Sequence, residues 1–74
     1  MIDTKYGEVF LENKPEAPED EPCFVLRAQD ELAADVIRVY GSMLFNKTKN
    51  IEAVSLLNKE ADRFDAWPVK KIPD

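Results

Sequence analysis

The sequence of 74 residues contains no histidine and only one cysteine, Cys23. Histidine is the usual general acid or base near neutral pH, so its absence removes the commonest catalytic group. One cysteine cannot form an intramolecular disulfide, and without histidine the chain lacks a zinc-type set of ligands. Cys23 lies in an apolar run, which favours a buried structural side chain over a reactive thiol. We therefore predict a protein that is not an enzyme and that needs no cofactor or metal.

Glycine, long apolar runs and positive charge are also scarce. The two glycines, Gly7 and Gly41, are isolated, which excludes a glycine-rich phosphate loop. No apolar run approaches the roughly 20 residues of a membrane-spanning helix, and the N-terminus lacks the features of a secretory signal. With 15 acidic and 10 basic side chains the net charge is −5, which disfavours binding to a nucleic-acid backbone. We expect a cytoplasmic protein that contacts neither a membrane nor nucleic acid directly.

The length allows one small domain, residues 1–74. A domain near this size buries only about 60% of the surface that its unfolded chain exposes. Small folds without a disulfide or a metal often gain stability by association. We therefore expect a homo-oligomer.

The first third of the chain is dominated by an acidic, proline-rich loop at residues 13–22, in which three prolines fix the backbone and remove donors. The loop fits both a recognition strip for a basic partner and a solvated connector. The runs on either side, residues 8–11 and 23–27, are rich in aromatic and β-branched residues. They predict two short strands suited to antiparallel pairing, either within one chain or between chains, the second buried on both faces.

The pattern changes to a helical period from Asp30 onward. A first helix is predicted over residues 30–45 with Asp30 as its N-cap, and a second over 50–66, capped by Asn50 or Thr48 and ended by Pro68. Their expected inner stripes are Leu32, Val36, Val39, Tyr40, Met43 and Leu44, and then Ile51, Val54, Leu57, Ala61 and Phe64. The short connection predicts an antiparallel hairpin, followed by an irregular tail at 68–74. The predicted fold class is α+β in the order ββαα, completed by oligomerisation.

Gly41 interrupts the first predicted helix. A glycine inside a helix costs about 1 kcal/mol relative to alanine. Two interpretations stay open: a close approach of another backbone at this position, or a tolerated weak point.

Three polar residues crowd the junction between the second strand and the first helix: Arg27, Gln29 and Asp30. An arginine can hold a carboxylate or phosphate with two parallel hydrogen bonds, and the first turn of a helix favours anions. This arrangement predicts a small polar site for an anionic ligand or partner. The same residues also fit a structural role, with Asp30 capping the helix and Arg27 fixing the acidic loop or a facing subunit.

A second candidate surface consists of the aromatic residues Tyr40 and Trp67, together with Phe64. Aromatic side chains are frequent at interaction hot spots, and they are equally suited to closing one end of a small core. The nearby carboxylates Asp62 and Asp65 are interpreted as part of a solvated helix face rather than as a catalytic pair.

The segment Phe24-Val25-Leu26-Arg27-Ala28-Gln29-Asp30, continued by Leu32-Ala33 and Val36, resembles small uncharacterised proteins of bacteriophages and prophages. The resemblance covers residues 19–40 and, more loosely, 60–73, but not residues 1–18. Those proteins have a Trp near the position of Tyr40 and a Pro early in the first helix, where this chain has Ala34 or Asp35. The resemblance implies a phage-type accessory protein, made in the bacterial cytoplasm, and assigns no active site.

Three functions are compatible with these observations. The first is a non-catalytic protein that binds and sequesters or inhibits a host or defence component, either a host protein or a small anionic ligand. The second is a structural or assembly accessory of a phage particle. The third is an acidic mimic of nucleic acid, motivated by the carboxylates between Glu12 and Glu21.

Overall fold

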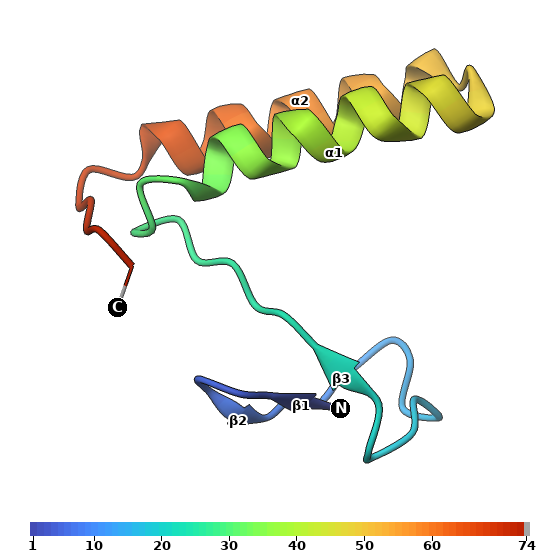
Figure 1. Cartoon of the computed structure of the whole chain (residues 1–74), viewed down its shortest axis with the longest axis vertical. Helices are drawn as coiled ribbons and strands as arrows, with labels where there is room; N and C mark the ends of the chain where they lie inside the picture. The colour runs from blue at the N-terminus through green and yellow to red at the C-terminus, as the bar shows by residue number, and fades with distance from the viewer. Residues whose placement is uncertain (74) are drawn as a thin grey trace.

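A helical hairpin and a very small sheet lie at opposite ends of an extended connecting segment (Figure 1). The computed structural model describes residues 1–73 in the order β1 (Ile2–Asp3), β2 (Gly7–Glu8), β3 (Pro22–Cys23), α1 (Ala33–Thr48) and α2 (Ile51–Ala66). The α+β class is therefore confirmed, with the strands preceding the helices as predicted.

Local side-chain and backbone signals set the ends of the helices. The Oδ1 atom of Asn50 accepts a hydrogen bond of 3.1 Å from the backbone N–H of Ala53, so the predicted cap of α2 is confirmed. The helix ends at Trp67, whose backbone is extended because a proline follows it. The predicted start of α1 is three residues early. Asp30 instead closes a turn, its Oδ1 accepting from the N–H of Leu32 at 2.8 Å, and the helix begins at Ala33 and runs on to Thr48.

The two helices pack through their smallest residues. Ala33 and Ala61 are fully buried, and Gly41 is buried beneath α2. A Cβ atom on Gly41 would lie 3.8 Å from Leu57 Cβ and 3.8 Å from Val54 Cγ1. The neighbours of Gly41 are therefore side chains of α2 rather than another backbone, and they leave room for a Cβ atom.

The predicted inner stripe of α1 is wrong for most of its members. Leu32, Val36, Val39, Tyr40 and Met43 are exposed, and only Leu44 is half-buried. Helices approach most closely where their side chains are small, and Gly41 lies against Val54 and Leu57 of α2, whereas these larger side chains of α1 are left exposed. The predicted stripe of α2 is largely right, because Val54, Leu57, Ala61 and Phe64 are buried or half-buried, whereas Ile51 is exposed.

The sheet differs from the predicted two-stranded ribbon. Its order is β2-β1-β3, with β1 antiparallel to β2 and parallel to β3. Of the predicted strands 8–11 and 23–27, only the first residue of each is in a strand, and residues 2–3 form the central strand between them. The run after Cys23 is extended but unpaired, and Phe24 is 82% exposed, so it is not a strand buried on both faces.

The proline-rich segment folds into successive turns rather than an extended loop. Backbone hydrogen bonds join Lys14 to Leu11, Ala17 to Lys14 and Glu21 to Pro18. The segment thereby returns the chain to the N-terminus, where the N–H of Ile2 donates to the carbonyl of Glu21 at 3.0 Å.

Candidate anion-binding pocket

One carboxylate organises the N-terminal part of the molecule. Asp3 is buried, and its Oδ1 accepts hydrogen bonds of 2.8 Å from the backbone N–H groups of Lys5 and Tyr6. Its Oδ2 accepts from the N–H of Val25 at 2.6 Å, 22 residues further along the chain. These bonds, chiefly those from Tyr6 and Val25, lower the pKa of Asp3 below its ordinary value because they stabilise the charged carboxylate. Asp3 thus fixes the turn after β1 against the segment that follows β3.

The C-terminal segment closes the opposite side. The N–H of Lys71 donates to the carbonyl of Gln29 at 2.6 Å, and the N–H of Glu31 donates to the carbonyl of Lys71 at 3.0 Å. The Nζ atom of Lys70 donates to the carbonyl of Ala28 at 2.9 Å. Residues 70–72 of the predicted irregular tail are therefore docked alongside residues 28–31.

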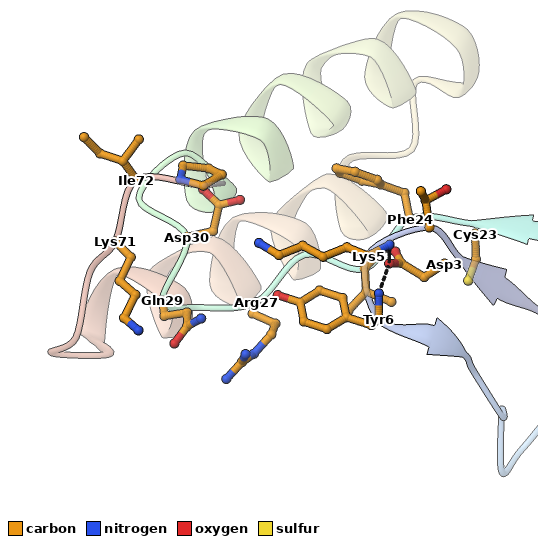
Figure 2. A pocket seen from close by; sticks show the side chains of 13 residues that line it. Asp3, Lys5, Tyr6, Cys23, Phe24, Arg27, Gln29, Asp30, Lys71 and Ile72 are labelled. Carbon is orange, nitrogen blue, oxygen red and sulfur yellow. Dashed lines mark hydrogen bonds between the residues drawn. The ribbon is translucent and has the colours of Figure 1, made fainter.

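A pocket of about 710 Å³ lies between these parts of the chain. Figure 2 shows side chains from the N-terminal turn, the connecting segment and the C-terminal segment around it. Its lining residues are Asp3, Thr4, Lys5, Tyr6, Cys23, Phe24, Val25, Arg27, Gln29, Asp30, Lys71, Ile72 and Pro73. All three residues of the predicted junction site, Arg27, Gln29 and Asp30, line this pocket.

The acidic side chains of the pocket already have hydrogen-bond partners, whereas its arginine has no carboxylate partner within the described part of the chain. The carboxylates of Asp3 and Asp30 both accept backbone N–H bonds. The Arg27 guanidinium lies 5.7 Å from the centre of the Tyr6 ring, within the range of a cation–π contact, and the Lys5 Nζ lies 5.6 Å from the same ring. Among residues 1–73, Arg27 has no carboxylate partner. The pocket therefore offers a guanidinium with unused donors to an anionic group.

Apolar surface adjoins these charges. Phe24 and Ile72 both line the pocket and are largely exposed, and Lys71 adds a cation from the C-terminal segment to Lys5 and Arg27. Figure 2 shows Arg27 beside Tyr6, with Gln29 and Lys71 on the side of the C-terminal segment. A carboxylate or phosphate attached to an apolar body matches this combination of donors and apolar surface.

The other two predicted site residues lie elsewhere. Tyr40 is in the middle of α1, and Trp67 follows the end of α2. Because Gly41 lies beside Leu57 and the helices are antiparallel, Tyr40 is level with about residue 58 of α2. At a rise of about 1.5 Å per residue, Trp67 lies roughly 13 Å further along the hairpin. Both side chains are more than half exposed. They are separated along the hairpin, and because both are exposed they do not close the end of a core.

Several residues of the site and the hairpin were missed by reasoning from the sequence. Asp3, Tyr6 and Lys71 come to the pocket from outside the predicted junction. The signal for Asp3 is local, because an Asp followed by a turn that ends in glycine is typical of a side chain that accepts nearby backbone N–H bonds. Gly7 supplies the positive φ of 85° with which that turn ends.

A cross-helix ion pair was also missed. Nη2 of Arg38 lies 3.1 Å from Asp62 Oδ1 and 2.6 Å from Asp65 Oδ2, so these carboxylates form more than a solvated face. Hydrogen bonds to Asp65 and then Asp62 raise the pKa of Arg38 further above its ordinary value. The signal was the i,i+3 spacing of Asp62 and Asp65 opposite an arginine on the antiparallel helix.

No protein-family model, curated protein or solved structure matches this chain. Within residues 1–73, no three Cys, Asp or Glu side chains converge as a metal site. Neither helix of this described part has the length and apolar character needed to cross a membrane.

Proposed function

We propose that this chain is a non-catalytic binding protein that recognises an anionic group of its partner in the pocket around Arg27. The observation that carries the proposal is the guanidinium of Arg27, which lines the pocket beside Tyr6 without a carboxylate partner among residues 1–73. Hydrogen bonds between an arginine and a carboxylate or phosphate are among the strongest in proteins, and their planar geometry selects for these groups.

The residues of the pocket favour binding over chemistry. The pocket contains no histidine, and its carboxylates Asp3 and Asp30 are already engaged by backbone N–H groups. A general base must be free to take a proton from its substrate, and a carboxylate committed to backbone donors is poorly placed to do so. These groups therefore hold the walls of the pocket in position, and Arg27 makes the contact with the ligand.

The resemblance to phage proteins supports a host component as the partner. The motif that carries this resemblance contributes Phe24, Val25, Arg27, Gln29 and Asp30 to the lining of the pocket. In the proposed function the protein acts in the bacterial cytoplasm and sequesters or inhibits a host or defence component through this pocket. The partner is a host protein with an exposed anionic group or a small anionic ligand.

A titration followed by amide chemical shifts tests the binding step. Phosphate, acetate and a nucleoside monophosphate are added separately to the wild-type protein and to Arg27→Ala, Arg27→Lys and Arg63→Ala. The last is the matched control, because Arg63 is an exposed arginine paired with Glu60 on α2.

We expect shifts at Tyr6, Gln29 and Lys71 in the wild type and in Arg63→Ala. Arg27→Ala should weaken binding several-fold or more, and Arg27→Lys should recover only part of it, since lysine cannot form the paired hydrogen bonds. Unchanged affinity in Arg27→Ala would overturn the proposal and leave the junction with a structural role only.

The partner is then identified by capture from bacterial lysate, with native mass spectrometry of the recovered protein to detect retained small molecules. The proposal requires the captured species to be lost with Arg27→Ala and kept with Arg63→Ala. A species captured equally by both variants would contradict binding through this pocket.

A second candidate function is that of an assembly accessory of a phage particle. It is favoured by one observation, the row of exposed apolar side chains on α1, because such rows pack against other subunits. Mass spectrometry of purified particles distinguishes this candidate, since a structural component is present at fixed stoichiometry and a cytoplasmic inhibitor is absent.

A further inference from the structure

The single chain exposes far more surface than a folded protein of its mass. Its accessible surface is 6093 Å², whereas a compact monomer of 8.5 kDa has about 4,700 Å². Its radius of gyration is 13.9 Å, against about 11 Å for a compact chain of this length. Among the described residues, no large side chain is fully buried. The chain thus carries about 1,400 Å² of surface beyond that of a compact monomer of its mass.

Part of the exposed apolar surface lies on one broad face of the helical hairpin. The ion pairs of Arg38 with Asp62 and Asp65 mark the polar face. Successive residues of a helix are turned by about 100° around its axis. On this basis, the side of the hairpin away from the Arg38 ion pairs carries large apolar side chains from both helices. We call this side the open face; its residues are Val36, Tyr40, Met43, Leu56 and Trp67, each between 46 and 67% exposed.

The rest of the described chain does not cover the open face. No Cα atom of the three strands comes within 8 Å of a helix Cα atom. Figure 1 shows the sheet standing away from the hairpin at the end of the connecting segment. The hairpin therefore has one face with the Arg38 ion pairs and an opposite face on which exposed apolar side chains share the surface with the Glu60–Arg63 ion pair.

We propose that a second copy of this chain covers the open face, so that two hairpins form a four-helix bundle. An antiparallel helix pair with one apolar face is the half-unit from which such bundles are built. An obligate homodimer buries about 2,000–5,000 Å² in total, and half of such an interface is similar in size to the surplus of about 1,400 Å² per chain, to which the sheet and the connecting segment also contribute.

A second copy fits this surface better than an unrelated protein. Among residues 1–73, the buried residues of the hairpin are Ala33, Ala34, Gly41 and Ala61, so the hairpin has little interior until the open face is covered. Folding and association are then coupled, and the partner must be present wherever the chain is made. Another copy always meets that requirement, and a two-fold arrangement buries the same face on both chains.

Two neighbouring residues of α2 provide a matched test. Leu56 lies on the open face and Ser55 on the polar side, and both are exposed in the single chain. A monomer would tolerate lysine at either position. In the proposed dimer, Leu56→Lys places a charge in the apolar interface of each subunit, whereas Ser55→Lys leaves both charges in water.

Sedimentation equilibrium over a range of concentrations gives the readout. We expect the wild type and Ser55→Lys to have twice the mass of the 8.5 kDa chain, and Leu56→Lys to raise the dissociation constant by about tenfold or more. A wild type that stays folded and monomeric at high micromolar concentration would overturn the proposal. So would a dimer that Leu56→Lys and Ser55→Lys affect equally.

A second measurement covers the case in which Leu56→Lys fails to fold. The thermal midpoint of the wild type should rise with protein concentration, because a dimer that unfolds to two chains obeys mass action. The emission of Trp67, the single tryptophan, should shift to longer wavelength on dilution as the open face becomes wet. A midpoint independent of concentration would contradict the proposed dimer.

Discussion

The hairpin and the N-terminal region are held together in opposite ways. The hairpin relies on local helical hydrogen bonds and on packing between the helices, where Gly41 of α1 lies against Val54 and Leu57 of α2. The N-terminal region has strands of only two residues, and it relies on one carboxylate, Asp3, that joins positions 22 residues apart. Distributed packing tolerates the loss of any one contact, whereas a region centred on one buried polar group depends on that group.

Removing the charge of Asp3 should have the largest effect and should separate the two regions. In Asp3→Asn one oxygen still accepts from Lys5 and Tyr6, but the amide nitrogen faces the N–H of Val25 and cannot accept from it. We expect hydrogen exchange at Val25 to accelerate by about tenfold while the helical circular dichroism is unchanged.

The matched control for this prediction is Asp20→Asn, which removes an exposed acidic charge from the proline-rich segment. Exchange at Val25 should stay at the wild-type rate in this variant. If both variants accelerate exchange equally, net charge rather than the Asp3 hydrogen bonds holds the N-terminal region.

Acid should reproduce the effect of Asp3→Asn in the wild-type protein. Because the folded pKa of Asp3 is lowered, the stability that this carboxylate supplies is complete above its ordinary value of 3.8. It is lost as the pH falls through the lower pKa of the folded state. The protection of the Val25 amide against exchange, relative to an unfolded peptide at the same pH, should therefore fall below pH 3.8 in the wild type and not in Asp3→Asn. Identical acid profiles would contradict the prediction.

The two glycines should respond to alanine with opposite signs. Gly41→Ala removes the cost of glycine inside α1 and places a Cβ at ordinary contact distance from α2, so we expect a gain of about 0.5–1 kcal/mol in the free energy of unfolding. Gly7 has a φ of 85°, where a Cβ is strained although the space around it is open, so Gly7→Ala should lose about 1 kcal/mol.

Chemical denaturation of the helices measures the first substitution, and hydrogen exchange in residues 2–8 measures the second. Destabilisation by Gly41→Ala would mean that α2 packs more tightly over this position than the 3.8 Å separations indicate.

The helices could be predicted from the sequence because their signals are local. The cap at Asn50, the stop at Trp67 and the helical period all act within a few residues. The buried face of α1 could not be predicted from hydrophobicity, which selects Val36 and Tyr40 ahead of Ala33 and Gly41. The prediction of the strands was wrong for a related reason. Strands of two residues have no periodicity, and their pairing is decided by partners distant in the chain.

The candidate site was predictable only on one side. Arg27, Gln29 and Asp30 are adjacent in the sequence, and their polar character at a strand-to-helix junction was visible there. Tyr6 and Lys71 reach the same pocket through long-range backbone contacts that no short pattern reveals. The sequence therefore indicated the polar residues on one side of the pocket, but not the residues that enclose it on the other sides.

The pairing of residues 29–31 with Lys71 has a mechanical consequence. Tension applied between the two ends of the chain would pass from β1 to β3 and across the bond between Gln29 and Lys71, and so bypass both helices. The hairpin would carry no load until that bridge ruptured. A stretched molecule would therefore yield first at these few backbone hydrogen bonds, with its helices still wound.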